Sequence, residues 1–165
     1  MNASKGFTLL EMLLVLVVIA LSASTVMLTT GQLNGSQGKA AKTGEQLNVL
    51  IEYAADWATM ENRLIGLRIQ DADWQFVVSE GKEWQEPDTQ YRLPSKGEWD
   101  ESWHIRLLPA SLKQRSSQSP QIVVTPDGEI TPFTLQVEDR DSGKTLFTLT
   151  SQGGLPLHFT PGKGR

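Results

Sequence analysis

The chain has 165 residues, which is enough for one compact domain and one long helix but not for two ordinary domains. Its net charge of −4 gives no global basic field, so the composition disfavours a nucleic-acid-binding protein. The absence of cysteine excludes disulfides, thiolate metal sites and a cysteine nucleophile.

The N-terminal part holds a long apolar segment. A short leader, residues 1–6, precedes an apolar run over residues 7–28 whose only charged residue is Glu11. As a helix this run would span about 33 Å, close to the roughly 30 Å hydrocarbon core of a membrane. A secretory signal peptide would have a shorter apolar core. A plain anchor would leave Glu11 unexplained, because an acid at bilayer depth costs about 2.5–3.5 kcal/mol.

The acid belongs to a recognisable motif. It closes the segment Lys5-Gly6-Phe7-Thr8-Leu9-Leu10-Glu11, which resembles the cleavage and methylation motif of type IV pilins and pseudopilins. In that family a prepilin peptidase cuts after the Gly, and the new N-terminal Phe is N-methylated. The resemblance therefore implies cleavage between Gly6 and Phe7, N-methylation of Phe7, and a role for Glu11 in subunit assembly. The Glu11 carboxylate of one subunit would pair with the Phe7 amine of another, turning two costly intramembrane charges into one contact.

A second helical segment is predicted beyond the membrane. Residues 31–38 contain Gly31, Asn34, Gly35 and Gly38. Each glycine lowers helix propensity by up to about 1 kcal/mol, which predicts a bend or a frayed turn. Apolar residues then recur at spacings of three and four, and this predicts an amphipathic helix over Ala40–Asn62. Its stripe consists of Leu47, Leu50, Ile51, Ala54, Trp57, Ala58 and Glu61. The stripe is interpreted as packing on a sheet, with a partner-binding groove helix as the alternative.

From Leu64 onward the chain is predicted to form β-structure, because runs rich in Val, Ile, Phe, Thr and Trp alternate with turn residues. The candidate strands are Leu64–Gln70, Trp74–Ser79, Trp103–Leu108, Gln121–Thr125, Pro132–Glu138, Lys144–Thr150 and Leu155–Thr160. The segments Asp71–Asp73 and Asp139–Gly143 are interpreted as hairpin loops. The polar segment Gly81–Ser102 predicts a long irregular excursion, Ser111–Ser119 a second loop, and Gly162–Arg165 a frayed tail.

The predicted fold class is α+β and pilin-like, with a long N-terminal helix packed on an antiparallel β-domain. The helix has a transmembrane half and an amphipathic half. The predicted division is a leader peptide over residues 1–6, a transmembrane helix over 7–30, a helix continuation over 31–62, and a periplasmic β-domain over 63–165. Lys5 favours the cytoplasmic side. The chain is therefore expected to cross the inner membrane once, with its C-terminal domain in the periplasm.

A second, narrower resemblance lies in the β-domain. The segment over residues 126–135 contains Gly128-Glu129-Ile130-Thr131-Pro132-Phe133, which resembles a Gly-Glu-x-Thr-Pro-Phe stretch of the H-type minor pseudopilins of type II secretion. Upstream, Glu61–Leu67 and Trp74–Phe76 resemble the helix exit and first hairpin of the same family. The local physics is ordinary, since Asp127-Gly128 makes a turn and Pro132 can begin a strand. A purely structural turn therefore remains open for this segment.

The resemblance implies a structural filament subunit rather than an enzyme. Its implied partners are the other minor pseudopilins (the I, J and K types), the major pseudopilin, the prepilin peptidase and the inner membrane, with no cofactor, metal or nucleic acid. It would belong to the pseudopilus tip complex that drives export of folded proteins across the outer membrane. The alternative is a minor pilin of a type IV pilus or a DNA-uptake pilus. The acidic balance argues against DNA, because phosphate contacts need clustered Lys or Arg.

Candidates for other chemistry are few. His104 and His158 each alternate with apolar neighbours in a predicted strand, and nothing marks either as a catalytic base. The pattern Asp139-x-Asp141-x-Gly143 is similar to the start of a calcium loop, but no acid closes it, so a hairpin turn is preferred. Four tryptophans could form a stacking platform, but they are interpreted as core and interface residues because few basic residues lie nearby. These are Trp74, Trp84, Trp99 and Trp103.

Overall fold

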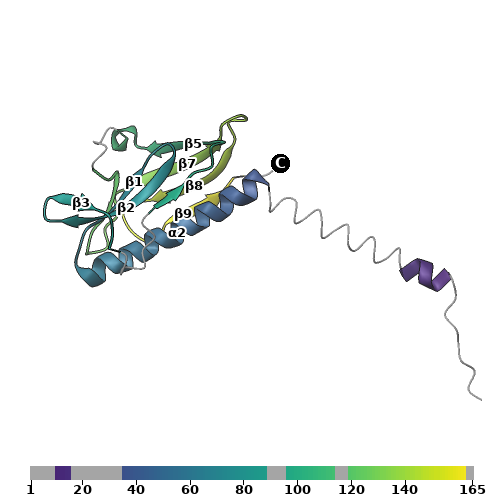
Figure 1. Cartoon of the computed structure of the whole chain (residues 1–165), viewed down its shortest axis with the longest axis horizontal. Coiled ribbons are helices and arrows are strands. Elements are labelled where there is room, and N and C mark those ends of the chain that lie inside the picture. The colour runs from purple at the N-terminus through teal and green to yellow at the C-terminus, as the bar shows by residue number, and fades with distance from the viewer. Residues whose placement is uncertain (1–9, 16–34, 89–95, 114–118, 163–165) are drawn as a thin grey trace, which may run out of the picture. The chain divides into compact units, whose positions relative to one another are not determined.

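The computed structural model in Figure 1 describes residues 10–15, 35–88, 96–113 and 119–162. The chain divides into two compact units, Met1–Lys39 and Ala40–Arg165. In the first unit, residues 10–15 are helical. Most of the expected transmembrane segment, residues 7–30, lies outside the described residues. No helix within the described ranges is long and apolar enough to cross a membrane.

Helix α2 spans Ser36–Glu61 and begins four residues before the predicted start at Ala40. Gly38 therefore lies inside the helix, and the predicted bend or frayed turn is wrong at that position. A single glycine costs only about 1 kcal/mol, which the packing of a long amphipathic helix offsets. Gly35 forms a bend directly before α2. The other two residues of the predicted bend, Gly31 and Asn34, lie outside the described residues.

The end of α2 follows from a left-handed residue. Asn62 has φ of 52°, and the N–H of Arg63 reaches back to the carbonyl of Ala58 at 3.1 Å. A left-handed residue with such a bond is a common way to satisfy the last free carbonyls of a helix. The chain can then turn directly into the first strand.

The predicted apolar stripe of α2 faces the protein core. The buried residues of the helix are Ala40, Gly44, Leu47, Ile51, Ala54, Ala55, Trp57 and Ala58. Leu50 is partly buried against the same cluster. Glu61, which the spacing placed in the stripe, is exposed. The interpretation as a sheet-packing helix is therefore confirmed for this face.

Nine antiparallel strands follow α2 in the described part of the chain and form two sheets (Figure 1). They are β1 (Ile65–Ile69), β2 (Asp73–Glu80), β3 (Glu83–Gln85), β4 (Lys96–Glu98), β5 (Trp103–Leu108), β6 (Ile122–Val124), β7 (Phe133–Asp139), β8 (Thr145–Ser151) and β9 (His158–Pro161). The first sheet has the order β3-β2-β1-β6, with β4 also paired to β2. The second has the order β5-β7-β8-β9. The chain changes sheet three times, from β4 to β5, back from β5 to β6, and again from β6 to β7.

Two predicted hairpin loops are confirmed. Between β1 and β2, the Gln70 N–H donates to the Asp73 carbonyl at 2.8 Å. Between β7 and β8, the Asp139 N–H donates to the Lys144 carbonyl at 2.8 Å. Gly143 completes this second turn with φ of 66°, a conformation that glycine adopts at little steric cost.

The segment Gly81–Ser102 was predicted to be an irregular excursion, and this is wrong in part. Strands β3 and β4 both lie within it and pair with β2. After β4, Trp99 is buried, with its indole N–H 3.1 Å from the carbonyls of Gln70 and Asp73. Three-residue strands carry too little alternation to be recognised, and these two depend on the long β2 beside them. The last strand is also shorter than predicted, because β9 begins at His158 rather than Leu155.

One hydrophobic cluster joins α2 to both sheets. The helix approaches the second sheet closely at Gly44, where an added Cβ would lie 2.5 Å from the Phe159 ring and 2.8 Å from the Phe147 ring. These two rings lie 5.9 Å apart. Glycine at this position therefore lets the helix backbone rest directly on the aromatic side chains of β8 and β9.

Replacing Gly44 with Leu should destabilise the domain. The new side chain has no room beside Phe147 and Phe159, and overpacking of this kind costs about 1–3 kcal/mol. We expect urea unfolding of a fragment covering residues 36–165 to show that loss. Gln46→Leu, which adds the same side chain to an exposed position of α2, should change the free energy of unfolding by less than about 0.5 kcal/mol. Equal stabilities for the two variants would contradict the close approach.

Candidate functional site

The N-terminal site predicted from the sequence is only partly described. Gly6 and Phe7, the expected cleavage and methylation residues, lie outside the described residues. Glu11 lies in the helical segment 10–15 and its side chain is exposed. The described apolar residues around it are exposed too: Leu10, Met12, Leu13, Leu14 and Val15. A helical segment that is apolar on all sides requires a lipid or protein environment.

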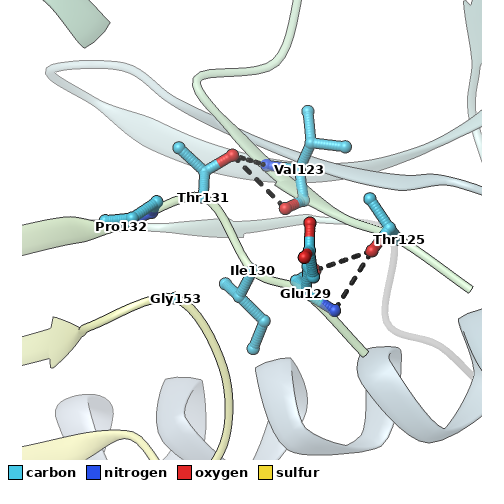
Figure 2. A pocket seen from close by; sticks show the side chains of 7 residues that line it. All are labelled: Val123, Thr125, Glu129, Ile130, Thr131, Pro132 and Gly153. Carbon is cyan, nitrogen blue, oxygen red and sulfur yellow. Dashed lines mark hydrogen bonds between the residues drawn. The ribbon is translucent and has the colours of Figure 1, made fainter. Parts of the chain in front are cut away.

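A second candidate site is a surface hollow of about 350 Å³ beside the segment that connects β6 to β7. It is lined by Val123, Thr125, Glu129, Ile130, Thr131, Pro132 and Gly153 (Figure 2). Four of these seven residues, Glu129 to Pro132, belong to the Gly-Glu-x-Thr-Pro-Phe segment at residues 128–133. The segment that resembles the H-type family therefore builds most of this hollow.

One side of the hollow is a tight turn closed by Thr125. The Thr125 N–H donates to the Glu129 carbonyl at 2.9 Å, and the Glu129 N–H donates to the Thr125 hydroxyl at 3.1 Å. That hydroxyl donates in turn to the Asp127 carboxylate. Gly128 occupies the left-handed region with φ of 87°, as the turn requires. The turn is therefore fixed by a single threonine through both its backbone and its side chain.

Thr131 holds the opposite side of the hollow against β6. Its hydroxyl accepts the Val123 N–H at 3.0 Å and lies 3.3 Å from the Val123 carbonyl, to which it donates (Figure 2). The Thr131 N–H donates to the same carbonyl at 2.9 Å. These bonds satisfy the outer edge of β6, which would otherwise be open to pairing with another strand.

The floor of the hollow involves a segment distant in sequence. Ile130 is almost fully buried, and its N–H donates to the Gly153 carbonyl at 2.9 Å. Gly153 is held by Ser151, whose buried hydroxyl accepts the Gly153 N–H at 3.1 Å. The loop after β8 is thereby fixed against the connection between the two sheets. Nothing in the sequence pattern around Gly153 predicted this contact.

Two turn carboxylates have perturbed ionisation. The hydrogen bond from the Thr125 hydroxyl holds the pKa of Asp127 below its usual value. In the β7–β8 turn, the bonds from the Ser142 hydroxyl and N–H hold the pKa of Asp139 below its usual value. Both groups therefore stay ionised to lower pH than an isolated aspartate. The Asp139 carboxylate caps its own hairpin, which agrees with the predicted turn.

The other sequence candidates remain dispersed. His104 and His158 are exposed on the edge strands β5 and β9. Trp74, Trp99 and Trp103 are buried, which confirms their interpretation as core residues. Trp84 on β3 is half-buried and lies apart from that core. Among the described residues, no group of three or more His, Asp or Glu side chains is placed to hold a metal ion.

Comparison with known proteins gives one consistent family. A family model described as "Type II transport protein GspH" matches residues 43–153. A second model, described as "Prokaryotic N-terminal methylation motif", matches residues 1–27. Type II secretion system protein H of Escherichia coli K12 is 36% identical, and the alignment covers 97% of this chain and 96% of that protein. The protein of the same name from Aeromonas hydrophila is 30% identical over 85% of this chain and 84% of that protein.

Solved structures share the fold. The solution structure of E. coli GspH is 30% identical, with a TM-score of 0.63, and covers 79% of this chain and 94% of that chain. The crystal structure of the minor pseudopilin EpsH of Vibrio cholerae has a TM-score of 0.62 at 18% identity. It covers 77% of this chain and 99% of that one. At that identity the second likeness concerns the fold alone.

Replacing Thr125 with Val should raise the pKa of Asp127 toward its ordinary value of about 3.9, because the hydroxyl bond is the main cause of the shift. A depressed folded-state pKa stabilises the fold above about pH 4, and this contribution is lost as the pH falls through the folded value. Carboxyl NMR titration of a fragment covering residues 36–165 measures the pKa values of Asp127 and Asp139. Asp139 serves as the internal control, because its partner is Ser142. An unchanged Asp127 titration would refute the assignment.

Proposed function

Since the chain belongs to the GspH family of type II transport proteins, we propose that it acts as a structural minor pseudopilin in the pseudopilus tip complex of type II secretion. The observation that carries the proposal is the combination of two matches in one chain. The GspH model covers the folded domain, and the methylation motif covers the N-terminus. The same combination favours type II secretion over the alternative of a type IV or DNA-uptake pilus.

The geometry of the β-domain supports a structural role rather than an enzymatic one. In the hollow described above, the polar groups of Thr125 and Thr131 are bonded to the protein itself. Of the described residues that line it, Glu129 alone is charged. These residues do not form a set of nucleophile, base and oxyanion donor of the kind that a hydrolase needs. We therefore assign the domain to assembly with other pseudopilins.

The N-terminal motif implies anchoring in the inner membrane. We propose that residues 7–30 cross it once, that the leader over residues 1–6 is removed from the cytoplasmic side, and that residues 63–165 lie in the periplasm. The length of the apolar run and Lys5 support this orientation.

We assign Glu11 to the contact between subunits. Cleavage before Phe7 would create a cationic amine at the membrane interface, and the carboxylate of a neighbouring subunit can pair with it. A subunit without a neighbour to supply that amine would keep an unpaired acid in hydrocarbon. Because this chain carries the acid, we place it below the outermost subunits of the tip, between them and the major pseudopilin shaft. The cost of an unpaired buried charge, several kcal/mol, favours this order of assembly.

Replacing Gly6 with a bulky residue such as Leu should leave the leader attached and abolish secretion. The prepilin peptidase must approach the Gly6–Phe7 bond closely, and a side chain at position 6 would obstruct it. Intact mass spectrometry of the membrane-extracted chain measures the outcome. Ser4→Leu, two positions further from the bond, is the matched control and should be processed. Processed Gly6→Leu chains with normal secretion would contradict the site.

Glu11→Ala should be cleaved and inserted normally but lost from the minor pseudopilin complex. Without the carboxylate, the amine of the neighbour stays unpaired, and we expect recovery of the complex to fall at least about tenfold. Quantitative co-purification from membranes measures this. Thr8→Ala, a neutral change in the same apolar run, should leave recovery unchanged. Wild-type stoichiometry for Glu11→Ala would mean that the acid serves another purpose.

A further inference from the structure

The fold explains most residues of the segment 128–133 that resembles the H-type family. Gly128 adopts a positive φ, and Thr131 closes the edge of β6. Pro132 directly precedes β7, and Phe133 is buried in the core. Each of these residue types is therefore required by the path of the chain.

Glu129 is the exception. Its backbone N–H and carbonyl are both bonded within the turn to Thr125. Its side chain is exposed, and no hydrogen bond or ion pair joins its carboxylate to any described residue. Any residue that can adopt this backbone conformation would satisfy the fold equally well. The charge of this side chain therefore makes no contact that stabilises the described part of the domain.

The surroundings of the Glu129 carboxylate favour a cation. Glu129 lines the hollow together with Val123 and Thr125 (Figure 2). Among the described residues, no lysine or arginine lines the hollow. The ion pairs formed among the described residues use other acids: Arg63–Glu80, Arg106–Glu138 and Lys113–Asp71. Asp127, two positions before Glu129, adds a second negative charge to the same turn.

The remaining lining is apolar and rigid. Val123 and Pro132 provide the accessible aliphatic surface of the hollow. The hydrogen bonds of Thr125, Thr131 and Gly153 fix the walls before any partner arrives. A pre-formed site loses little conformational entropy when it is occupied. An aliphatic stem that ends in a positive charge matches such a hollow in both parts.

We propose that this hollow receives a lysine or arginine side chain from a neighbouring pseudopilin. The cationic group pairs with the Glu129 carboxylate, and the aliphatic stem lies over Val123 and Pro132. The inference rests on the proposed function, because the occupant is another subunit of the same assembly. Charge complementarity selects the occupant, since an acidic or purely apolar side chain would leave the carboxylate without a partner.

Co-purification of the full-length chain with the other pseudopilins, titrated against salt, tests the proposal. For Glu129→Lys we expect the affinity to fall by at least about tenfold, because the substitution places two like charges together. Glu129→Gln keeps the shape of the side chain and should bind more weakly than wild type, with a smaller dependence on salt. Glu83→Lys makes the same charge reversal at an exposed position of β3 and should bind as wild type.

The outcomes distinguish failure of the Glu129 contact from failure of the proposed function. If wild type recovers other pseudopilins and Glu129→Lys recovers them equally well, the inference is wrong and the proposed function stands. If wild type recovers none, the proposed function fails first. Because the Glu129 side chain has no described partner, both Glu129 variants should unfold at the same temperature as wild type. A basic-to-Glu change in a partner that restores binding to Glu129→Lys would identify the occupant.

Discussion

The packing of α2 on the inner faces of β8 and β9 is the contact on which the domain depends. Each sheet is apolar on one face, and a single helix contributes to covering both through one continuous core. Gly44 allows this by bringing the helix backbone onto the Phe147 and Phe159 rings. Helix α2 and the two sheets therefore form one folded unit from Ala40 onward.

The connection from β6 to β7 contains both residues that stabilise the fold and a residue that is free for recognition. Thr125 and Thr131 close a turn and an edge strand, and the loop held by Ser151 locks Ile130 into the core. These bonds leave a rigid hollow at the surface. Glu129 is the residue of the segment whose side chain the fold does not use. An interface can therefore be built on an obligatory turn without any cost to the domain.

The sequence predicted those features that depend on local periodicity. The stripe of α2 and the long strands β2, β5, β7 and β8 follow from spacing and alternation, and both hairpin loops follow from turn residues. Strands β3 and β4 were missed, because three residues show no alternation and pair only through β2. The hollow was missed because Gly153 and Ile130 meet across a long stretch of chain. The motif at Gly6, Phe7 and Glu11 was recognised by resemblance, and its geometry lies largely outside the described residues.

Disulfide cross-linking in native membranes directly tests whether subunits assemble through Glu11. The absence of native cysteine makes each adduct assignable. A cysteine at Leu14, exposed three positions after Glu11, reports whether this segment packs against another subunit. We expect adducts with cysteines in the corresponding segment of other pseudopilins. We expect these adducts to be lost when Glu11 is replaced by Ala in the same chain. Adducts that persist without the acid, or that never form with another pseudopilin, would contradict assembly through this carboxylate.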